Sequence, residues 1–447
     1  MTANTFTSYN DALDYLFHFT DYERMHKVKK ATSIFGLDRM TRILAHCGNP
    51  HEKLRTVHIA GTKGKGSTAA MLASILRNAG RSVGLYTSPH LLDIRERIQV
   101  DGEWIAEDAV TAILSRLHPY LEEATRDGDT YAPTFFEIFT TIAFLHFLEQ
   151  DVDVAIIEVG LGGRLDATNV VRPEACAITP ISFDHTDKLG TELSQIAGEK
   201  AGIIKEGVPV VSGVQQPEAL AAIRARAAEL DAPVRLVGED VTVADGPGDA
   251  FSVRTWRREL SDLHLSLLGR HQRDNAATAV GLAELLCEGG SEISDACVRD
   301  GLASLRWPGR IQLVASDPDV VIDGGHNVAS ITALLDTLAA LPPKTTTFVV
   351  GIAADKDVDA VLRLLAPQAE AFVVTRTSNP RAADTADLKA SLEALGAENV
   401  TEAATPAAAL DLARSQTPPS GRICVTGSMY LAGDSLAQLP GAGAKVF

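Results

Sequence analysis

The sequence predicts an α/β protein built of two domains. Short apolar runs of strand type alternate with helical stretches along most of the 447 residues, which is the pattern of parallel sheets covered by helices. A chain of this length exceeds what one hydrophobic core ordinarily organises. The breaking sequence Trp307-Pro308-Gly309 is followed by a new series of strands and helices. We therefore expect one domain over residues 1–306 and a second, smaller one over residues 307–447.

Composition and charge exclude several classes of partner. The net charge of −17 argues against nucleic acid and against anionic membranes, since both need a basic face. No apolar run reaches the length of a membrane span, and the first ten residues lack a basic start with an apolar core. Five scattered cysteines without a C-x-x-C pair indicate neither a disulfide framework nor a zinc site. We expect a cytoplasmic monomer that acts on small molecules.

Two short helices, expected over residues 9–19 and 37–45, precede a strand over residues 56–60 and a helix over residues 68–76. The loop between this strand and helix reads Gly61-Thr62-Lys63-Gly64-Lys65-Gly66-Ser67. Its glycines let backbone N–H groups surround an anion at a helix N-terminus, and Lys65 adds a full charge, so we predict a nucleotide triphosphate as ligand. The spacing differs from the common G-x-x-x-x-G-K-[ST] because Gly66 separates Lys65 from Ser67. A glycine-rich turn without ligand would explain two glycines, but not three glycines, two lysines and a hydroxyl together.

The next elements bring polar groups to strand ends and helix starts. A strand over residues 82–86 is followed by Ser88, a hairpin over residues 97–105 and a long helix over residues 107–126. Thr134-Phe135-Phe136-Glu137 then opens a helix as a capping box, which explains both polar residues and favours a core role for the two phenylalanines. Stacking on an aromatic substrate is the alternative.

Two acidic strand ends follow. Glu158 lies at the end of an apolar strand over residues 153–159. A magnesium ligand for a nucleotide bound at the glycine loop (the P-loop) is expected there. An edge carboxylate in solvent is the alternative. Asp184-His185 follows a strand over residues 175–181 and is either a second metal contact or a surface pair. Lys200, in a helix over residues 194–204, is by itself most simply an ion-pairing lysine.

Later segments supply further candidates. Asn275 is expected in the first turn of an alanine-rich helix, where it reads a base edge or caps the helix. In the second domain we expect strands near residues 320, 348, 372 and 424, and a helix over residues 401–414. Polar strand ends occur there at residues 323–327, 355–357 and 426–430, with exposed loops as the alternative interpretation.

Taken together, these stretches resemble the folylpolyglutamate synthase and dihydrofolate synthase group of the Mur ligase superfamily. The resemblance runs in order through residues 61–67, 87–91, 158–169, 184–186, 199–205, 271–275, 306–310, 323–327 and 426–430. It implies an ATP-dependent amide ligase with a P-loop, Mur-ligase-like domain and a smaller Rossmann-like C-terminal domain, the active site lying between them. Lys63, Gly325 and Ser182-Phe183 depart from the family pattern, where Asn, Ala and a Gly-Leu pair are more usual.

The resemblance also implies roles for single residues. The nucleotide contacts are Gly61, Thr62, Gly64, Lys65, Gly66, Ser67, Asn275, Arg310 and Asp323. The Mg²⁺ contacts are Ser67, Ser88, Glu158, His185 and a carbamylated Lys200. The pterin site holds Phe135, Phe136 and Asp166, and the glutamate site holds His326 and Ser428. The catalytic residues are Lys65, His185, Lys200 and His326.

The implied reaction joins L-glutamate to folate, and also to dihydropteroate, through an acyl phosphate made with ATP and Mg²⁺. The domains are expected to close around the substrates, since water would destroy that intermediate. A Mur-type cell-wall ligase is one alternative, although the roughly sixty residues ahead of the P-loop are few for its extra domain. A switch module that hydrolyses ATP without ligation is the other.

Overall fold

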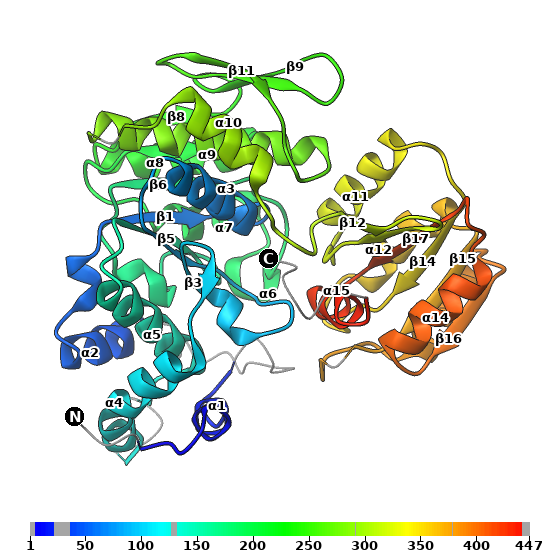
Figure 1. Ribbon diagram of the computed structural model, residues 1–447, viewed down its shortest axis with the longest axis horizontal. Helices are drawn as coiled ribbons and strands as arrows, with labels where there is room; N and C mark the ends of the chain where they lie inside the picture. The colour runs from blue at the N-terminus through cyan, green and yellow to red at the C-terminus, as the bar shows by residue number, and fades with distance from the viewer. Residues whose placement is uncertain (1–4, 22–35, 127–131, 291, 378, 440–447) are drawn as a thin grey trace.

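The computed structural model describes residues 5–21, 36–126, 132–290, 292–377 and 379–439, which form two bodies (Figure 1). The larger body is built on an eight-stranded sheet with the order β4-β3-β2-β5-β1-β6-β7-β8. All neighbours pair in parallel except β2 with β3 and β3 with β4. The strands are β1 Thr56–Ala60, β2 Val83–Tyr86, β3 Ile98–Val100, β4 Glu103–Trp104, β5 Val154–Glu158, β6 Ala175–Ile178, β7 Val210–Ser212 and β8 Val234–Leu236.

Helices cover both faces of this sheet. They are α1 Tyr9–Phe17, α2 Asp38–His46, α3 Lys65–Asn78, α4 Glu107–Arg126, α5 Phe135–Glu149, α6 Thr186–Leu189, α7 Leu193–Ala201, α8 Pro217–Glu229, α9 Arg270–Glu288 and α10 Asp295–Ser304. Short 3-10 turns are η1 Pro50–Lys53, η2 Ile94–Arg97 and η3 Ala167–Val170. A separate antiparallel sheet, β9 Thr242–Asp245, β10 Phe251–Arg254 and β11 Glu259–Leu263, lies at the top of this body in Figure 1.

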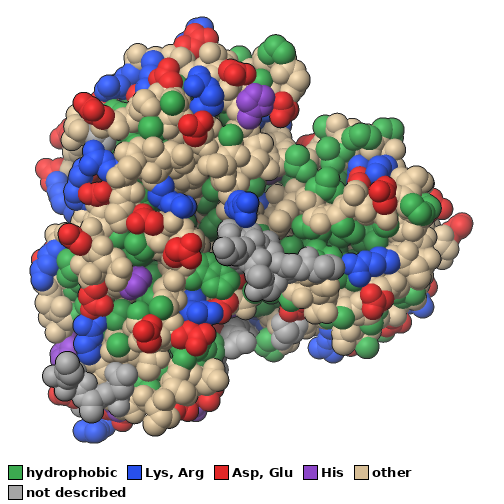
Figure 2. Space-filling view, viewed as in Figure 1, with side chains coloured by type: hydrophobic (Ala, Val, Ile, Leu, Met, Phe, Trp, Pro, Cys, Tyr) green, Lys and Arg blue, Asp and Glu red, His purple; other side chains and the backbone are tan. Residues whose placement is uncertain are grey.

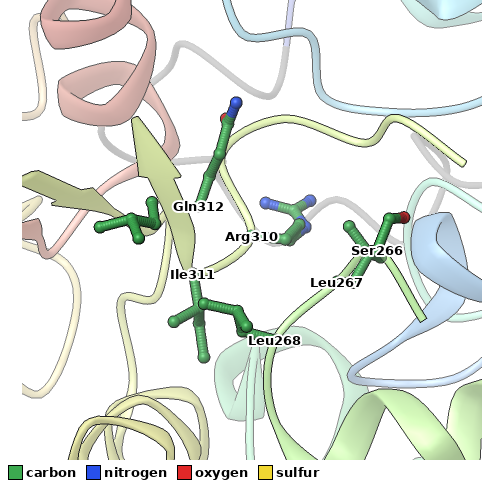
Figure 3. A pocket seen from close by; sticks show the side chains of 7 residues that line it. Ser266, Leu267, Leu268, Arg310, Ile311 and Gln312 are labelled. Carbon is green, nitrogen blue, oxygen red and sulfur yellow. The ribbon is translucent and has the colours of Figure 1, made fainter. Parts of the chain in front are cut away.

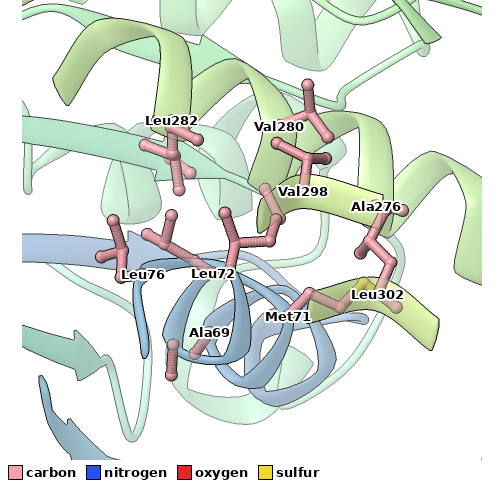
Figure 4. Close-up of a cluster of buried hydrophobic side chains, with 14 of the residues drawn as sticks. Ala69, Met71, Leu72, Leu76, Ala276, Val280, Leu282, Val298 and Leu302 are labelled. Atoms are coloured by element: carbon pink, nitrogen blue, oxygen red, sulfur yellow. The ribbon is translucent and has the colours of Figure 1, made fainter. Parts of the chain in front are cut away.

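One apolar core joins the P-loop helix to the helices that end this body. Met71 and Leu72 of α3 meet Val280 of α9 and Leu302 of α10 in a single buried cluster (Figure 4). The approach is so close that a Cβ at Gly301 would lie 2.7 Å from the Cα of Ile75. The buried face of α3 therefore fixes the direction in which its N-terminus points.

The smaller body has a six-stranded sheet with the order β12-β13-β17-β14-β15-β16, in which only β12 is antiparallel. Its strands are β12 Gln312–Ala315, β13 Asp319–Ile322, β14 Thr346–Val350, β15 Ala371–Thr375, β16 Val400–Ala403 and β17 Arg422–Thr426. Its helices are α11 Val328–Ala340, α12 Val358–Leu365, α13 Thr385–Ala394, α14 Pro406–Gln416 and α15 Met429–Leu436, with a 3-10 turn η4 Ala366–Gln368.

The connection between α10 and β12 is anchored at both ends. Trp307 packs against the core of the larger body, and Ile311 is buried in a core cluster of the smaller one. We propose that the domain boundary lies in this connection, as the sequence predicts. Figure 2 shows a notch between the two bodies.

Several predicted elements are confirmed, and some are corrected. The strands around the P-loop, the hairpin of β3 with β4 and the helix α4 occur where they were expected. The expected helix over residues 401–414 is wrong at its beginning, because residues 400–403 pair with β15 as strand β16 and α14 starts only at Pro406. The helices of the described residues contain no apolar stretch of the length that a membrane span requires.

Candidate active site

The glycine loop lies between two strand ends because β1 is paired with β5 on one side and β6 on the other. Gly64 has φ 84° and is the N-cap of α3, so the positive end of the helix begins at Lys65. A side chain at Gly61 would overlap Thr179, and one at Gly64 would overlap the Asn275 amide. The loop is therefore closed in by its neighbours and must keep glycine at both positions.

Lys65 lies close to Glu158, the predicted metal ligand at the end of the adjacent strand β5. Its Nζ lies 3.8 Å from Glu158 Oε1, and Glu158 Oε2 accepts a hydrogen bond of 3.1 Å from the Ser88 backbone N–H. Glu158 is buried, and burial raises its carboxyl pKa despite the opposing effect of Lys65. The structure thus brings Lys65, Ser88 and Glu158 together, with Ser67 in the first turn of α3.

Lys200 reaches the same loop from α7. It is 4% exposed and donates a 2.8 Å hydrogen bond from Nζ to the Gly61 carbonyl. Burial, followed by the charge of Lys65, lowers its pKa to about 7. Near neutral pH a large share of Lys200 is therefore an uncharged amine, which is the form that reacts as a nucleophile.

Asp184 joins the two bodies. One carboxylate oxygen lies 3.1 Å from Lys63 Nζ and accepts a 2.8 Å hydrogen bond from Asn327, while the other lies 3.0 Å from Lys356 Nζ. Burial alone would raise the carboxyl pKa, but Lys63 first and then the other cations hold it well below its usual value. No local pattern indicates that Lys63 and Lys356 share this partner, because Asp184 lies 121 and 172 residues from them.

Two histidines flank Asp184. His185 has φ 50°, is the N-cap of α6, and has its Nε2 atom 3.8 Å from Asp184 Oδ1. His326 reaches the carboxylate from the smaller body, with Nε2 4.0 Å from Oδ2, while its Nδ1 atom is 3.0 Å from the Gly324 carbonyl oxygen. The predicted catalytic histidines thus come from different bodies and converge on one carboxylate.

The remaining candidates of the smaller body lie just after the ends of two paired strands, Asp323 after β13 and Ser428 after β17. Asp323 accepts hydrogen bonds from Ile311 N–H at 3.1 Å and Gly325 N–H at 2.8 Å, and burial raises its pKa. Ser428 is the N-cap of α15 and accepts from Tyr430 N–H. Arg310 lines a cavity of about 200 Å³ at the junction of the bodies, together with Ser266, Leu267, Leu268, Ile311, Gln312 and Leu313 (Figure 3).

Asn275 lies against the glycine loop, but not in the turn that the sequence predicted. The helix α9 starts earlier, at Arg270 after Gly269 with φ 102°, so that Asn275 falls in its second turn. Its Nδ2 atom donates to Gln272 at 2.9 Å. The predicted position in the first turn is therefore wrong, the capping alternative is excluded because Gly269 is the N-cap, and the amide faces Gly64.

The expected capping box at the start of α5 is present, with both Thr134 and Glu137 bonded as predicted. Phe135 is 1% exposed and stacks on Phe139, so it belongs to the core. Phe136 is only half-buried, and its ring lies 2.6 Å from where a Cβ of Gly160 would be. Phe136 therefore packs on the loop over residues 160–166 that also carries Asp166.

A divalent cation at this site would need ligands beyond the carboxylates. Among the described ranges, no group of three or more His, Cys, Asp or Glu side chains could hold a metal. Mg²⁺ bound with a nucleotide ordinarily uses one or two carboxylates, hydroxyls, waters and phosphate oxygens. One buried carboxylate, Glu158, beside the loop that carries Ser67 and the segment that carries Ser88, fits that donor set.

Comparison with known proteins gives matches over nearly the whole chain. The Mur ligase middle domain matches residues 59–283, and the Mur ligase glutamate ligase domain matches residues 309–429. The dihydrofolate synthase/folylpolyglutamate synthase of Bacillus subtilis is 38% identical over 436 residues, covering 96% of this chain and 98% of that protein. The protein of the same name from Escherichia coli is 34% identical and covers 91% and 92%.

Solved structures agree with these matches. Mycobacterium tuberculosis folylpolyglutamate synthase complexed with ADP has a TM-score of 0.88 at 32% identity, covering 96% of this chain and 97% of that one. Escherichia coli FolC in complex with DHPP and ADP has a TM-score of 0.85 at 32% identity, covering 98% of both chains.

Proposed function

The chain belongs to the folylpolyglutamate synthase/dihydrofolate synthase family of the Mur ligase superfamily, and we propose that it joins L-glutamate to folates and to dihydropteroate with hydrolysis of ATP. The observation that carries the proposal is the meeting of the P-loop residue Lys65 with the buried Glu158 at the end of the adjoining strand. A buried carboxylate beside a phosphate-binding lysine is the arrangement expected for a nucleotide bound with Mg²⁺.

The reaction needs an activated acid. A carboxylate oxygen of the acceptor attacks the γ-phosphorus of ATP, the bond to ADP breaks, and an acyl phosphate forms. The amine of L-glutamate then attacks the carbonyl carbon, phosphate leaves, and the amine loses a proton. Lys65 and Arg310 offset the negative charge on the transferred phosphoryl group.

Ser67, Ser88, Glu158 and His185 are the side chains that would hold Mg²⁺, which when bound neutralises phosphate charge. Glu158 needs no movement for this role, since its backbone partner at Ser88 already orients it. Asn275, next to Gly64, and Asp323, next to Arg310, form the walls of the nucleotide site on the two bodies.

We also propose that Lys200 is carbamylated. Its uncharged Nζ attacks carbon dioxide, a C–N bond forms and Nζ releases a proton, which replaces the neutral amine with an anionic carbamate. Its burial and its pKa of about 7 support this step, because a lysine of ordinary pKa would be almost fully protonated. Intact-protein mass spectrometry with and without bicarbonate tests it, and an identical mass in both would contradict it.

Phe136 and Asp166 bind the pterin ring, with Phe135 supporting Phe136 from the core. His326 and Ser428 bind L-glutamate from the smaller body. The contacts of Asp184 with Lys356 and Asn327 support closure of the two bodies over these substrates.

The decisive experiment is mass spectrometry of the products formed with ATP, Mg²⁺, L-glutamate and either dihydropteroate or tetrahydrofolate. Glutamate addition to both is the expected result. Addition to neither, while ATP is still hydrolysed, would contradict the proposal. We also propose that the protein is a cytoplasmic monomer. Light scattering tests the monomeric state.

A further inference from the structure

A buried chain of hydrogen bonds connects the P-loop strand to the loop that carries Asp166. His58, in the middle of β1, is fully buried, and its Nε2 atom lies 2.9 Å from the Thr168 hydroxyl. Thr168, also fully buried, donates that hydroxyl to Asp166 Oδ1. The backbone N–H groups of Thr168 and Leu161 donate to Oδ1 and Oδ2 at 3.0 and 2.8 Å.

The direction of this chain follows from counting protons. The Thr168 hydroxyl has one proton and gives it to Asp166, so it can only accept from His58, which must then carry its proton on Nε2. Burial lowers the pKa of His58 to about 3, so the ring is neutral and Nδ1 has no proton. Nδ1 is buried without a partner among the described residues. An unpaired nitrogen lone pair lowers stability less than an unpaired N–H group would.

The chain leaves Asp166 with one acceptor position. Oδ1 accepts from both the backbone and the side chain of Thr168, while Oδ2 accepts from Leu161 among the residues that the structure describes. Each carboxylate oxygen has two lone pairs, so Oδ2 keeps one. The neighbouring Phe136 packs on the same loop at Gly160.

We infer that His58 and Thr168 are positioning residues for pterin recognition, which hold the Asp166 carboxylate so that its free Oδ2 lone pair accepts from the 2-amino group of the pterin. The inference rests on the proposed function, in which Asp166 binds the pterin. Neither His58 nor Thr168 touches the substrate. Folate and dihydropteroate share the same N–H edge, so both substrates depend on the chain equally.

A purely structural role is the competing explanation. Packing alone would be met by apolar side chains of the same shape, whereas three buried polar groups lower stability unless each is hydrogen-bonded. Two explanations of the polar chain remain. It orients Asp166 for the substrate, or it only holds the 160–169 loop in place. The two explanations differ in which kinetic constant a variant changes.

Substitutions of matched shape separate these explanations. Thr168→Val removes the hydroxyl and Thr168→Ser retains it, while His58→Leu removes the donor and His58→Gln places an amide N–H near the position of Nε2. Thr347→Val is the control, because Thr347 is a buried threonine of β14 whose hydroxyl likewise accepts a hydrogen bond, at 2.7 Å from Thr417.

We expect Thr168→Val to raise the KM for dihydropteroate and for tetrahydrofolate about tenfold, as for loss of a hydrogen bond to a charged group. The KM for ATP and for L-glutamate stays unchanged. Thr168→Ser and His58→Gln restore most of the wild-type KM, and Thr347→Val lowers the melting temperature without changing any KM. If Thr168→Val does not fold, His58→Leu tests the same chain from its other end, with an expected rise of about threefold in the same KM.

A substrate analogue sharpens the test. When the 2-amino group of the pterin is replaced by methyl, Thr168→Val and wild type should have similar KM values, because the N–H donor is already absent. Equal rises in all four KM values, or a lower melting temperature with unchanged KM values for both acceptors, would show a purely structural role and overturn the inference. Failure of the wild type to add glutamate to either acceptor would instead overturn the proposed function.

Discussion

Two carboxylates lie near the ends of the strands that pair with β1 on either side of the P-loop, and their surroundings are opposite. Glu158, the last residue of β5, has Lys65 at 3.8 Å, and burial raises its pKa. Asp184, after β6, has Lys63 at 3.1 Å and Lys356 at 3.0 Å, and its pKa is lowered. The ionised carboxylate of Glu158 thus lowers the stability of the fold, whereas that of Asp184 raises it.

The difference indicates two uses of a buried charge. Glu158 remains under-compensated, as is common for groups that await a cationic ligand. Asp184 is saturated by partners from both bodies, so its charge contributes to their association. Variants of the two residues should therefore separate activity from stability.

The largest effect should come from Glu158→Gln, which keeps the shape and removes the charge. We expect kcat for glutamate addition to fall about 100- to 1,000-fold, in the range seen when one preorganised electrostatic group is removed. The melting temperature should stay the same or rise, because a buried charge is lost. Glu284→Gln is the matched control, since Glu284 is 1% exposed but paired with Arg257 at 3.0 Å and Arg258 at 2.7 Å. It should lower the melting temperature and leave kcat unchanged.

Asp184→Asn should have the opposite pattern. It leaves Lys63 and Lys356 close together without a counter-charge, so we expect a loss of about 2 kcal/mol in unfolding free energy. We expect kcat to fall about tenfold, because the two bodies close less readily. Calorimetry and steady-state kinetics measure these changes. A variant as stable as the wild type would show that the contacts of Asp184 are not stabilising.

Lys356→Met removes one of the contacts that the smaller body makes with Asp184 and should be milder. We expect a loss of about 1 kcal/mol and a fall in kcat of about threefold, since Lys63 still neutralises Asp184. Lys344→Met is the control, because Lys344 pairs with Asp319 at 3.0 Å within the smaller body. Small-angle scattering with ATP and substrate should show a less compact Lys356→Met enzyme and an unaltered Lys344→Met enzyme. Equal compactness of the two variants would contradict a role of Lys356 in closure.

The smallest expected effect is on the pH dependence of stability, to which Asp184 and Glu158 should contribute with opposite sign. The pKa of Asp184 in the folded state is below its ordinary 3.8, so its stabilising contribution is complete above that pH and is lost as the pH falls. The pKa of Glu158 is above its ordinary 4.5, so its unfavourable contribution is present at neutral pH and disappears as the pH falls. The difference in melting temperature between Glu158→Gln and Asp184→Asn should therefore shrink from pH 7 to pH 4. A constant difference would contradict the assigned pKa shifts.

Local sequence signals predicted the parts of this site that one segment builds. The strand, glycine loop and helix around Lys65 and the capping box at Thr134 are encoded within a few residues, and both were predicted correctly. The network of Asp184 could not be predicted in this way, because its partners come from distant segments that only the fold brings together. Strand β16 was missed because Val400 to Ala403 is short, and its strand character comes from pairing with β15 rather than from its composition.

The anchored connection between the bodies bears on the construction of chimeras. Arg310 lies between Trp307, which is held by the first core, and Ile311, which is held by the second. A graft that exchanges the C-terminal domain between relatives therefore separates Arg310, which we propose as a nucleotide contact, from one of its two anchors if the junction is placed at residue 309 or 310. A junction in the exposed end of α10, near Ser304, moves the whole anchored segment as one unit, and the recipient must then match the core contacts of Leu305 and the packing of Trp307 beside Gly66.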